Sequence, residues 1–232
     1  MNVVSIMAHQ DDEMRCLGTM LKCRARGDRL HFVTLTDGSH GIPNMSREES
    51  AKTRAREMAS VAEALGADYI NLAVEDEFLY DTPEIRMRLI DAIRQTKADL
   101  IFTHYHDDYN LDHTTTFQLV RHAAMQSCLP LLKTKSQFLT RHPAIFLVEP
   151  HTPGVFPASH FVDITEVEDQ KVELEKKHSS QEDAMQLVMG IGFDKICRRP
   201  DAYWGEKAGC EYAECFVPMP ARGAIKPYPV LP

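Results

Sequence analysis

Short apolar runs alternate with helical stretches through the first half of this chain. The runs cover residues 2–8, 30–36, 69–72 and 100–103. Continuous apolar runs this short are typical of strands that are buried on both faces of a sheet. The stretches between them have helical period, and helical crossovers join parallel strands. The pattern therefore predicts an α/β fold with a parallel, doubly wound sheet.

Helices are predicted where residues of helical period follow each run. Residues 46–49 (SREE) form a capping box, and Pro83 suits the first position of a helix. The second half adds strands at 144–148 and 160–164 and an extended, proline-rich tail from residue 218. The predicted helices cover residues 14–26, 46–65, 83–97, 112–127, 166–178 and 181–209, the last interrupted at Gly190 and Gly192. No linker or repeat divides the chain, so we expect a single domain over residues 1–232.

Composition disfavours several classes of protein. The formal net charge is −8 without any basic stripe, which argues against nucleic-acid binding. No apolar run approaches the roughly 20 residues of a membrane span, and the first residues read as a strand rather than a signal peptide. The 6 cysteines contain no CxxC pair. We therefore expect reduced thiols and a cytoplasmic location.

Two dense polar stretches follow two of the predicted strands. Residues 8–13 (AHQDDE) follow the first, and residues 104–113 (HYHDDYNLDH) follow the fourth. Right-handed crossovers keep the carboxyl ends of parallel strands at one sheet edge, where α/β proteins bind ligands. If these two strands are neighbours, the polar stretches converge in one crevice.

The residue types in these stretches suit a divalent metal. His9 and Asp12 are three positions apart around a turn, a spacing that can chelate, and His113 supplies a third ligand. Three such ligands with an open position are typical of catalytic zinc, although other divalent ions could occupy the set. Asp11 would remain free to take a proton from water. Helix capping explains either stretch alone equally well, but so many ionisable groups at one edge favour a cation.

The sequence resembles the LmbE-like (PIG-L) de-N-acetylase family. Its motif Ala-His-Pro-Asp-Asp-Glu stands here as AHQDDE at 8–13, and its motif Asp-Tyr-His-Pro-Asp-His as DYNLDH at 108–113. Further similar segments are TDG at 36–38, RARE at 54–57, FVDI at 161–164 and KHSSQ at 177–181. The resemblance implies a Rossmann-like three-layer sandwich with a mostly parallel sheet and an active site at the carboxyl ends of the strands.

The resemblance also implies an activity. It indicates a zinc-dependent hydrolase that removes the acetyl group from a small N-acetylated amino sugar or sugar conjugate. The family's metal ligands match His9, Asp12 and His113, and its general base matches Asp11, in agreement with the residues alone. Because such hydrolases are often oligomeric, a homo-oligomer is a further expectation.

Two departures from the family motifs affect these expectations. Gln10 replaces a proline, which removes no reactive group. Asn110 replaces a histidine that acts beside the metal, and an amide can donate a hydrogen bond to an oxyanion but cannot shuttle a proton. Asp112 would then orient His113. Proton return would fall to Asp11, or else to His104 or His106, although a surface or hinge role is the commoner one for such histidines.

Other candidates carry weaker signals. Arg54 matches a family position that faces the crevice and could bind substrate, although a helix-surface ion pair is the commoner role. His178 reads as a helix-end residue that could line the site. Tyr203 and Trp204 could pack on a sugar but are more typical of a core. His151 and His160 read as structural residues.

Two other functions compete with hydrolysis. One is a metal-holding but catalytically weak binding or regulatory protein of the same fold, which Asn110 favours. The other is a nucleotide-binding domain without metal. No GxGxxG or Walker pattern follows the first strand, so this second alternative ranks low.

Overall fold

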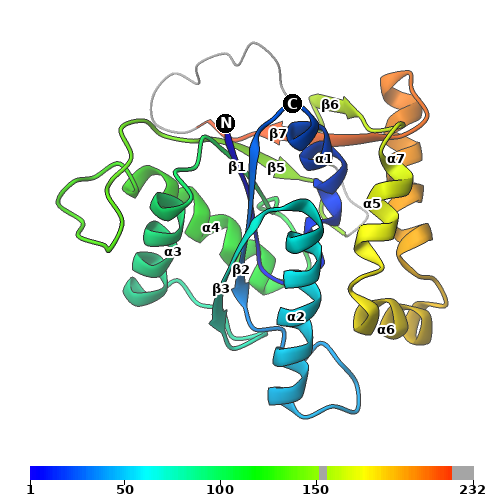
Figure 1. Cartoon of the computed structure of the whole chain (residues 1–232), viewed down its shortest axis with the longest axis horizontal. Coiled ribbons are helices and arrows are strands. Elements are labelled where there is room, and N and C mark those ends of the chain that lie inside the picture. The colour runs from blue at the N-terminus through cyan, green and yellow to red at the C-terminus, as the bar shows by residue number, and fades with distance from the viewer. Residues whose placement is uncertain (152–155, 221–232) are drawn as a thin grey trace.

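The computed structural model describes residues 1–151 and 156–220, which form a sheet covered by helices (Figure 1). Its strands are β1 (Asn2–Met7), β2 (Arg29–Thr36), β3 (Asp68–Val74), β4 (Leu100–Thr103), β5 (Ala144–Val148), β6 (His160–Asp163) and β7 (Ala213–Pro218). Its α-helices are α1 (Leu17–Ala25), α2 (Arg47–Leu65), α3 (Pro83–Gln95), α4 (Leu111–Gln126), α5 (Glu168–Glu175), α6 (Ser179–Met189) and α7 (Phe193–Ala208). A 3₁₀ helix, η1 (Asp12–Arg15), precedes α1.

The sheet order is β3-β2-β1-β4-β5-β7-β6. The five strands from β3 to β5 run parallel, whereas β7 is antiparallel to both of its neighbours. β1 and β4 are adjacent, with Val3 opposite Leu100 and Ser5 opposite Phe102. The expected mostly parallel sheet is therefore confirmed, and so is the adjacency that brings the two polar stretches together.

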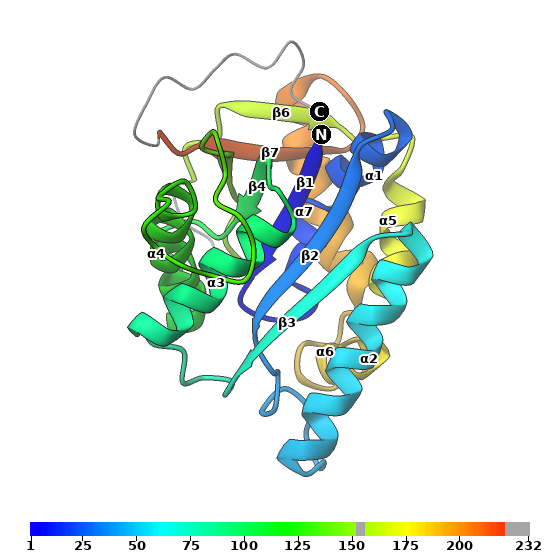
Figure 2. The same ribbon diagram turned by 60° about the vertical axis from the view of Figure 1, so that its left-hand side comes forward.

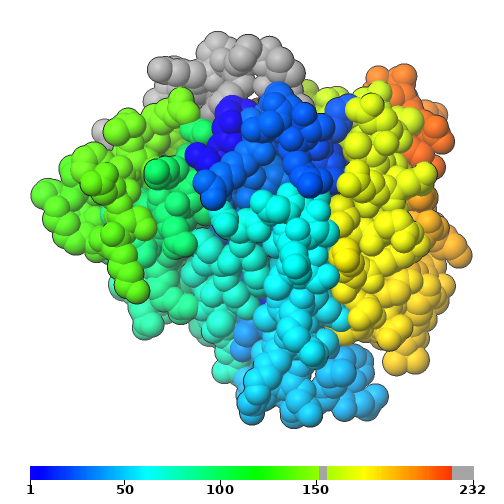
Figure 3. Space-filling view, viewed as in Figure 1, coloured from blue at the N-terminus to red at the C-terminus, as the bar shows by residue number. Residues whose placement is uncertain are grey.

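Helices cover both faces of the sheet and make a three-layer sandwich. Figure 2 shows α3 and α4 on one face and α1, α2 and α5 on the other. The side chains of α2 and α5 meet along this second face in Figure 3. α7 packs against β7 at the opposite end of the sheet from β3.

The first apolar run is continuous because both of its faces are buried. Val4 and Ile6 pack into the core beneath α3 and α4, whereas Val3 and Met7 pack into the core beneath α1 and α2. All four are at most 1% exposed. Burying a side chain of this size contributes about 1.5–3 kcal/mol, so alternate residues of the strand anchor opposite layers.

The helix starts follow the local signals closely. The capping box at Ser46 and Glu49 is present, and Pro83 is the first residue of α3. The first helix begins later than expected, at Leu17, because the chain makes the separate 3₁₀ turn η1 directly after β1. The predicted final helix is divided into α6 and α7, and Gly190 ends α6 with φ of 67°.

One strand was not anticipated from the sequence. β7 inserts between β5 and β6, so the sheet is not uniformly parallel. Of the expected extended tail, residues 221–232 lie outside the described residues. No described helix has the length and apolarity needed to cross a membrane. All 6 cysteines are described, and each is a free thiol.

Candidate functional site

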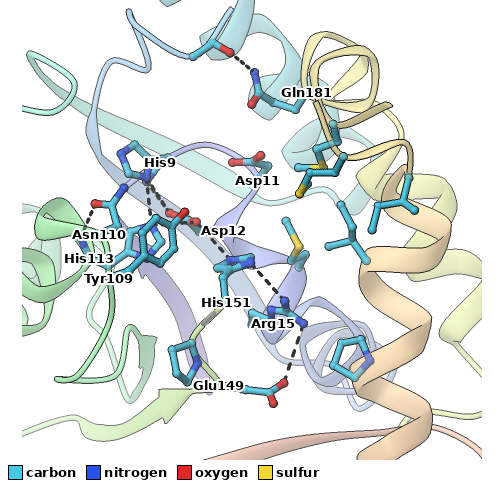
Figure 4. Close-up of a pocket in the computed structure, with 18 of the residues that line it drawn as sticks. His9, Asp11, Asp12, Arg15, Tyr109, Asn110, His113, Glu149, His151 and Gln181 are labelled. Atoms are coloured by element: carbon cyan, nitrogen blue, oxygen red, sulfur yellow. Dashed lines mark hydrogen bonds and ion pairs between the residues drawn. The ribbon is translucent and has the colours of Figure 1, made fainter. Parts of the chain in front are cut away.

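The candidate site lies where β1, β4 and β5 end at one edge of the sheet (Figure 4). The segment after β1 supplies His9, Asp11 and Asp12. The segment after β4 leads into α4 and supplies His113, and the segment after β5 supplies His151. The two polar stretches therefore meet, as the strand pattern predicted.

Three side chains with potential ligand atoms face one another at the centre of the site. His9 Nδ1 lies 3.2 Å from His113 Nε2 and 3.3 Å from Asp12 Oδ2, and His113 Nε2 lies 3.3 Å from Asp12 Oδ1. Ligands held at zinc–ligand bond lengths of about 2.0–2.1 Å in a tetrahedron stand about 3.3 Å apart. The spacing of these three side chains therefore fits a small divalent cation.

The outer nitrogens of both histidines face carboxylates. His113 Nδ1 lies 3.0 Å from Asp108 Oδ2, and His9 Nε2 lies 3.0 Å from Asp76 Oδ1 and 3.4 Å from Asp112 Oδ2. Carboxylates in these positions hold the proton on the outer nitrogen and leave the inner nitrogen free for a metal. The donor set thus fits a metal chemically as well as by distance.

The expectation that Asp112 orients His113 is wrong. Asp112 accepts hydrogen bonds from the backbone N–H groups of Glu77 (2.8 Å) and Leu79 (3.2 Å) and faces His9 instead. Asp108 orients His113, because the first turn of α4 points the His113 ring back toward the loop that precedes the helix.

Asp12 is held ionised by its surroundings. Its Oδ2 accepts a 2.8 Å hydrogen bond from the backbone N–H of His9. Burial opposes ionisation, but His113 beside the carboxylate holds the pKa of Asp12 well below its usual value. Asp12 therefore meets the site as an anion, the form that binds a cation.

Asp11 lines the same pocket but is not part of this ligand set, although it is the residue before Asp12. Its φ of 102° lies in the left-handed region, which turns its side chain toward Arg54. Its backbone N–H donates to Glu13 Oε2 at 2.9 Å. Burial raises the pKa of the Asp11 carboxyl to about 6, although the Arg54 guanidinium opposes the rise. The capping interpretation is wrong for Asp11 and Asp12, because neither caps η1 or α1 with its side chain.

Arg54 is buried beneath Asp11, at 3% exposure, and is not a helix-surface residue. Its Nη2 donates to Asp11 Oδ1 at 2.8 Å and also to the backbone oxygen of Gln10. The glycine-rich loop after β2 wraps this side chain, and a Cβ at Gly41 would overlap Nη1 of Arg54. Gln10 is fully buried and donates to the backbone oxygen of Thr36 at 3.0 Å, which ties the turn to β2.

Asn110 lines the pocket and is the N-cap of α4. Its Oδ1 accepts from the backbone N–H groups of Asp112 (2.7 Å) and His113 (3.3 Å). The residue in place of the family's histidine therefore fixes the start of the helix that carries His113.

The two other histidines of the fourth-strand segment lie in different places. His106 is exposed, as expected, but His104 is buried beneath the site at 3% exposure, so its surface assignment is wrong. His104 Nε2 accepts from the backbone N–H of Ala8 at 2.9 Å, and its ring stacks on His113 with centroids 4.0 Å apart. Burial lowers the pKa of His104 to about 4, so this ring supports the site as a neutral group.

His151 lines the pocket, contrary to the structural role expected of it. Its Nε2 lies 3.7 Å from Asp12 Oδ1, and its Nδ1 accepts from Arg15 Nη2 at 3.2 Å. Burial, with Arg15 beside it, lowers the pKa of His151 to about 3. The sequence did contain one indication that His151 lies in the site. It comes just after a buried parallel strand, as His9 does.

His178 lies behind the site rather than in its lining. It is fully buried, and its Nε2 lies 2.7 Å from Glu13 Oε1. Burial lowers the pKa of His178, but the neighbouring Glu13 raises it by more, so the pKa lies above its usual value. Glu13 in turn receives the N–H of Asp11, so this pair holds the strained turn in place.

The pocket has a volume of about 850 Å³ and two unlike sides. The sheet edge provides its polar side. η1, α6, α7 and the loop between these two helices provide apolar side chains opposite it, namely Met14, Met185, Met189, Ile191 and Ile196. Tyr203 and Trp204 lie outside this lining, where Trp204 packs on Phe156 and Phe161. They do not reach a ligand in this pocket.

A protein-family model described as "PIG-L: GlcNAc-PI de-N-acetylase" matches residues 4–124, more than half of the chain. The chain belongs to the PIG-L family. The matched region contains the ligand set, Asp11 and Arg54, whereas His151 and His178 of this PIG-L chain lie beyond it.

Relatives and solved structures agree with this membership. A diacetylchitobiose deacetylase of Thermococcus kodakarensis is 29% identical over 93% of this chain and 83% of its own length. The structure of N,N'-diacetylchitobiose deacetylase from Pyrococcus horikoshii superposes with a TM-score of 0.81 at 26% identity, covering 94% of this chain and 83% of that one.

A second solved structure shows that the same fold occurs in a protein of another name. GalB, the 4-carboxy-2-hydroxymuconate hydratase from Pseudomonas putida KT2440, superposes with a TM-score of 0.80 at 21% identity, covering 98% of this chain and 100% of that one. At this identity the likeness shows the fold alone. Function must therefore be argued from the side chains of the site.

Proposed function

We propose that this protein is a metal-dependent hydrolase that removes the acetyl group from the nitrogen of an N-acetylated amino sugar or sugar conjugate. The observation that carries the proposal is that the two adjacent acids after β1, Asp11 and Asp12, have different partners. His9 and Asp12 face His113, while Asp11 stays outside this group, lines the same pocket and pairs with Arg54. The two diacetylchitobiose deacetylases support the choice of substrate class.

Zinc is the proposed cofactor, held by His9, Asp12 and His113, although this donor set also accepts other divalent ions. A metal bound there supplies Lewis acidity, which lowers the pKa of water and polarises the acetyl carbonyl. Asp76 and Asp112 behind His9, with Asp108 behind His113, keep the ligand nitrogens free of protons.

Asp11 is the proposed general base. Water loses a proton to the Asp11 carboxylate as its oxygen forms a bond to the acetyl carbon. The carbon–nitrogen bond then breaks, and the proton held by Asp11 passes to the departing nitrogen. The products are a free amine and acetate. Arg54 holds Asp11 at Oδ1, leaving Oδ2 for the water.

Other residues receive supporting roles in this proposal. Asn110 presents its amide nitrogen to the pocket while its oxygen caps α4. Asp112 positions His9. Arg54 reaches the pocket wall, where it can also contact a substrate hydroxyl or carboxylate.

The test is an Asp11→Asn variant assayed on a panel of N-acetyl sugars for free amine and acetate. Zinc content should stay at the wild-type value because the ligands are intact, and kcat should fall at least 100-fold because the base is lost. Asp107→Asn, an exposed change nearby, is the matched control and should retain full activity. Full turnover by Asp11→Asn would contradict the mechanism.

The alternative that Asn110 favours is a metal-holding protein with weak catalysis. Under this alternative the zinc-loaded wild-type protein would release no acetate from any sugar of the panel. The same assay therefore separates the two functions.

A further inference from the structure

We infer that His151 is a further catalytic residue of this site, whose Nε2–H donates a hydrogen bond to the acetyl oxygen as that oxygen gains negative charge. The inference rests on the proposed hydrolysis and adds to it a histidine donor, since Asn110 stands where the family's motif has a histidine.

The position of His151 suits this role. It follows β5, so it reaches the site from the strand next to β4, on the side of Asp12 that faces away from His9. Its Nε2 lies 3.7 Å from Asp12 Oδ1, and its ring centroid lies 5.9 Å from that of His113 (Figure 4). An oxygen drawn to the ligand set would therefore lie within reach of this nitrogen.

Arg15 decides which nitrogen of His151 carries the proton. A guanidinium can only donate, and Arg15 Nη2 lies 3.2 Å from His151 Nδ1. Nδ1 must therefore accept, which places the single proton of the neutral ring on Nε2, the nitrogen that faces the site. Glu149 Oε2, 3.9 Å from Arg15 Nη1, helps to hold the guanidinium in place.

The same reasoning excludes His151 from the ligand set. His9 and His113 have carboxylates on their outer nitrogens, which leave the inner nitrogens free to bind a metal. His151 has a cation on its outer nitrogen, which gives its inner nitrogen a proton and makes it a donor. The charge of the outer partner thus divides the three histidines into two ligands and one donor.

Arg15 acts as a positioning residue in this arrangement. It lies in η1 three residues after Asp12, and its side chain is 10% exposed. One short turn, η1, carries both Asp12 and Arg15. The proposed metal ligand and the residue that determines the tautomer of His151 are therefore held by the same backbone segment.

The kinetic test uses the zinc-loaded protein and the N-acetyl sugar that it turns over best. His151→Ala should lower kcat by about 100-fold with little change in KM, since removing one oxyanion donor costs about 10²–10³ in rate. His151→Gln retains an N–H donor and should recover part of the loss. Arg15→Met should lower kcat by about 10-fold. His122→Ala and Arg24→Met, both exposed, are the matched controls and should leave kcat unchanged.

Two readouts do not depend on turnover. Zinc content should be the same in wild type, His151→Ala and Arg15→Met. Two-bond ¹H–¹⁵N correlation spectra of zinc-loaded wild type should show His151 neutral with its proton on Nε2, and Arg15→Met should shift that proton toward Nδ1. These readouts remain informative if no sugar is turned over, which would count against the proposed hydrolysis instead.

Three results would overturn the inference. A loss of zinc in His151→Ala would make the residue a ligand. A spectrum with the His151 proton on Nδ1 in wild type would remove the donor. Full kcat in His151→Ala, with acetate still released, would leave the hydrolysis standing without this residue.

Discussion

His113 bonds to Asp108 through its outer nitrogen, and this contact leaves its inner nitrogen free for the proposed metal. The Asp108 side chain is itself fully shielded from solvent, and its Oδ1 accepts from the backbone N–H of Asn110 at 3.0 Å. Burial acts against the charge of Asp108, but His113 beside it keeps the pKa of this carboxyl below its usual value. The anion is therefore in place at neutral pH.

Asp108→Asn should weaken zinc binding by about 10- to 100-fold, the usual cost of losing the carboxylate behind a ligand histidine. An amide cannot fix the tautomer of His113 as a carboxylate does. Competition with a chromophoric chelator measures the change in Kd. Asp107→Asn, one residue away and exposed, is the control and should bind zinc as wild type does. Equal zinc affinity in the two variants would refute this role for Asp108.

At the scale of whole elements, β7 connects the sheet to α1, the helix that follows the turn carrying Asp12. Glu214 of β7 accepts from the backbone N–H groups of Gly18 (2.8 Å) and Thr19 (2.7 Å), so it caps α1 from a distant part of the chain. The buried Lys171 of α5 pairs with Glu214 at 2.9 Å and with Asp201 of α7 at 2.5 Å. One buried charge cluster therefore joins α1, α5, α7 and β7.

Glu214→Gln should destabilise the protein by about 3 kcal/mol, because it removes one partner of a buried ion pair and leaves Lys171 under-compensated. Urea unfolding followed by circular dichroism measures the loss. Glu48→Gln, which removes an exposed pair with Lys52 on α2, should leave the unfolding midpoint unchanged. If both variants unfolded at the wild-type urea concentration, the cluster would not stabilise the fold as described.

At the scale of the whole molecule, the proposed metal would link segments that are about 100 residues apart in sequence. His9 and Asp12 follow β1, and His113 lies on α4 after β4. The unfolded chain does not hold these ligands together, so a metal that binds only the native state adds its binding free energy to stability.

Removing the metal with a chelator should therefore lower Tm, and adding zinc should restore it. Zinc at 100 times its Kd stabilises by about 2.7 kcal/mol, which is about 5–10 °C for a chain of this size. Differential scanning calorimetry measures the shift. His113→Ala should show no response to zinc, whereas the exposed change His122→Ala should respond as wild type does. A zinc-dependent rise in Tm of His113→Ala would place the metal elsewhere.

The sequence alone was sufficient for the parallel half of the sheet and for the place of the site. Runs such as residues 2–8 are largely apolar because both faces of the sheet are covered. This pattern can be read from the sequence alone, without knowledge of the tertiary contacts. Since parallel strands end at one edge, His9, Asp11, Asp12 and His113 could be assigned to one crevice before their contacts were known.

The tertiary structure alone decided what each side chain of the site can do. β7 was missed because the buried Glu214, whose partners come from other elements, interrupts its apolar run. The roles of Asp108, Arg15 and Arg54 likewise depend on their partners, which are His113, His151 and Asp11 respectively. Whether a histidine can bind a metal or donate a proton depends on the charge of the group behind its ring. For His113 that group is Asp108, 5 residues away in the same loop and helix, but for His151 it is Arg15, 136 residues away, which only the strand order brings close.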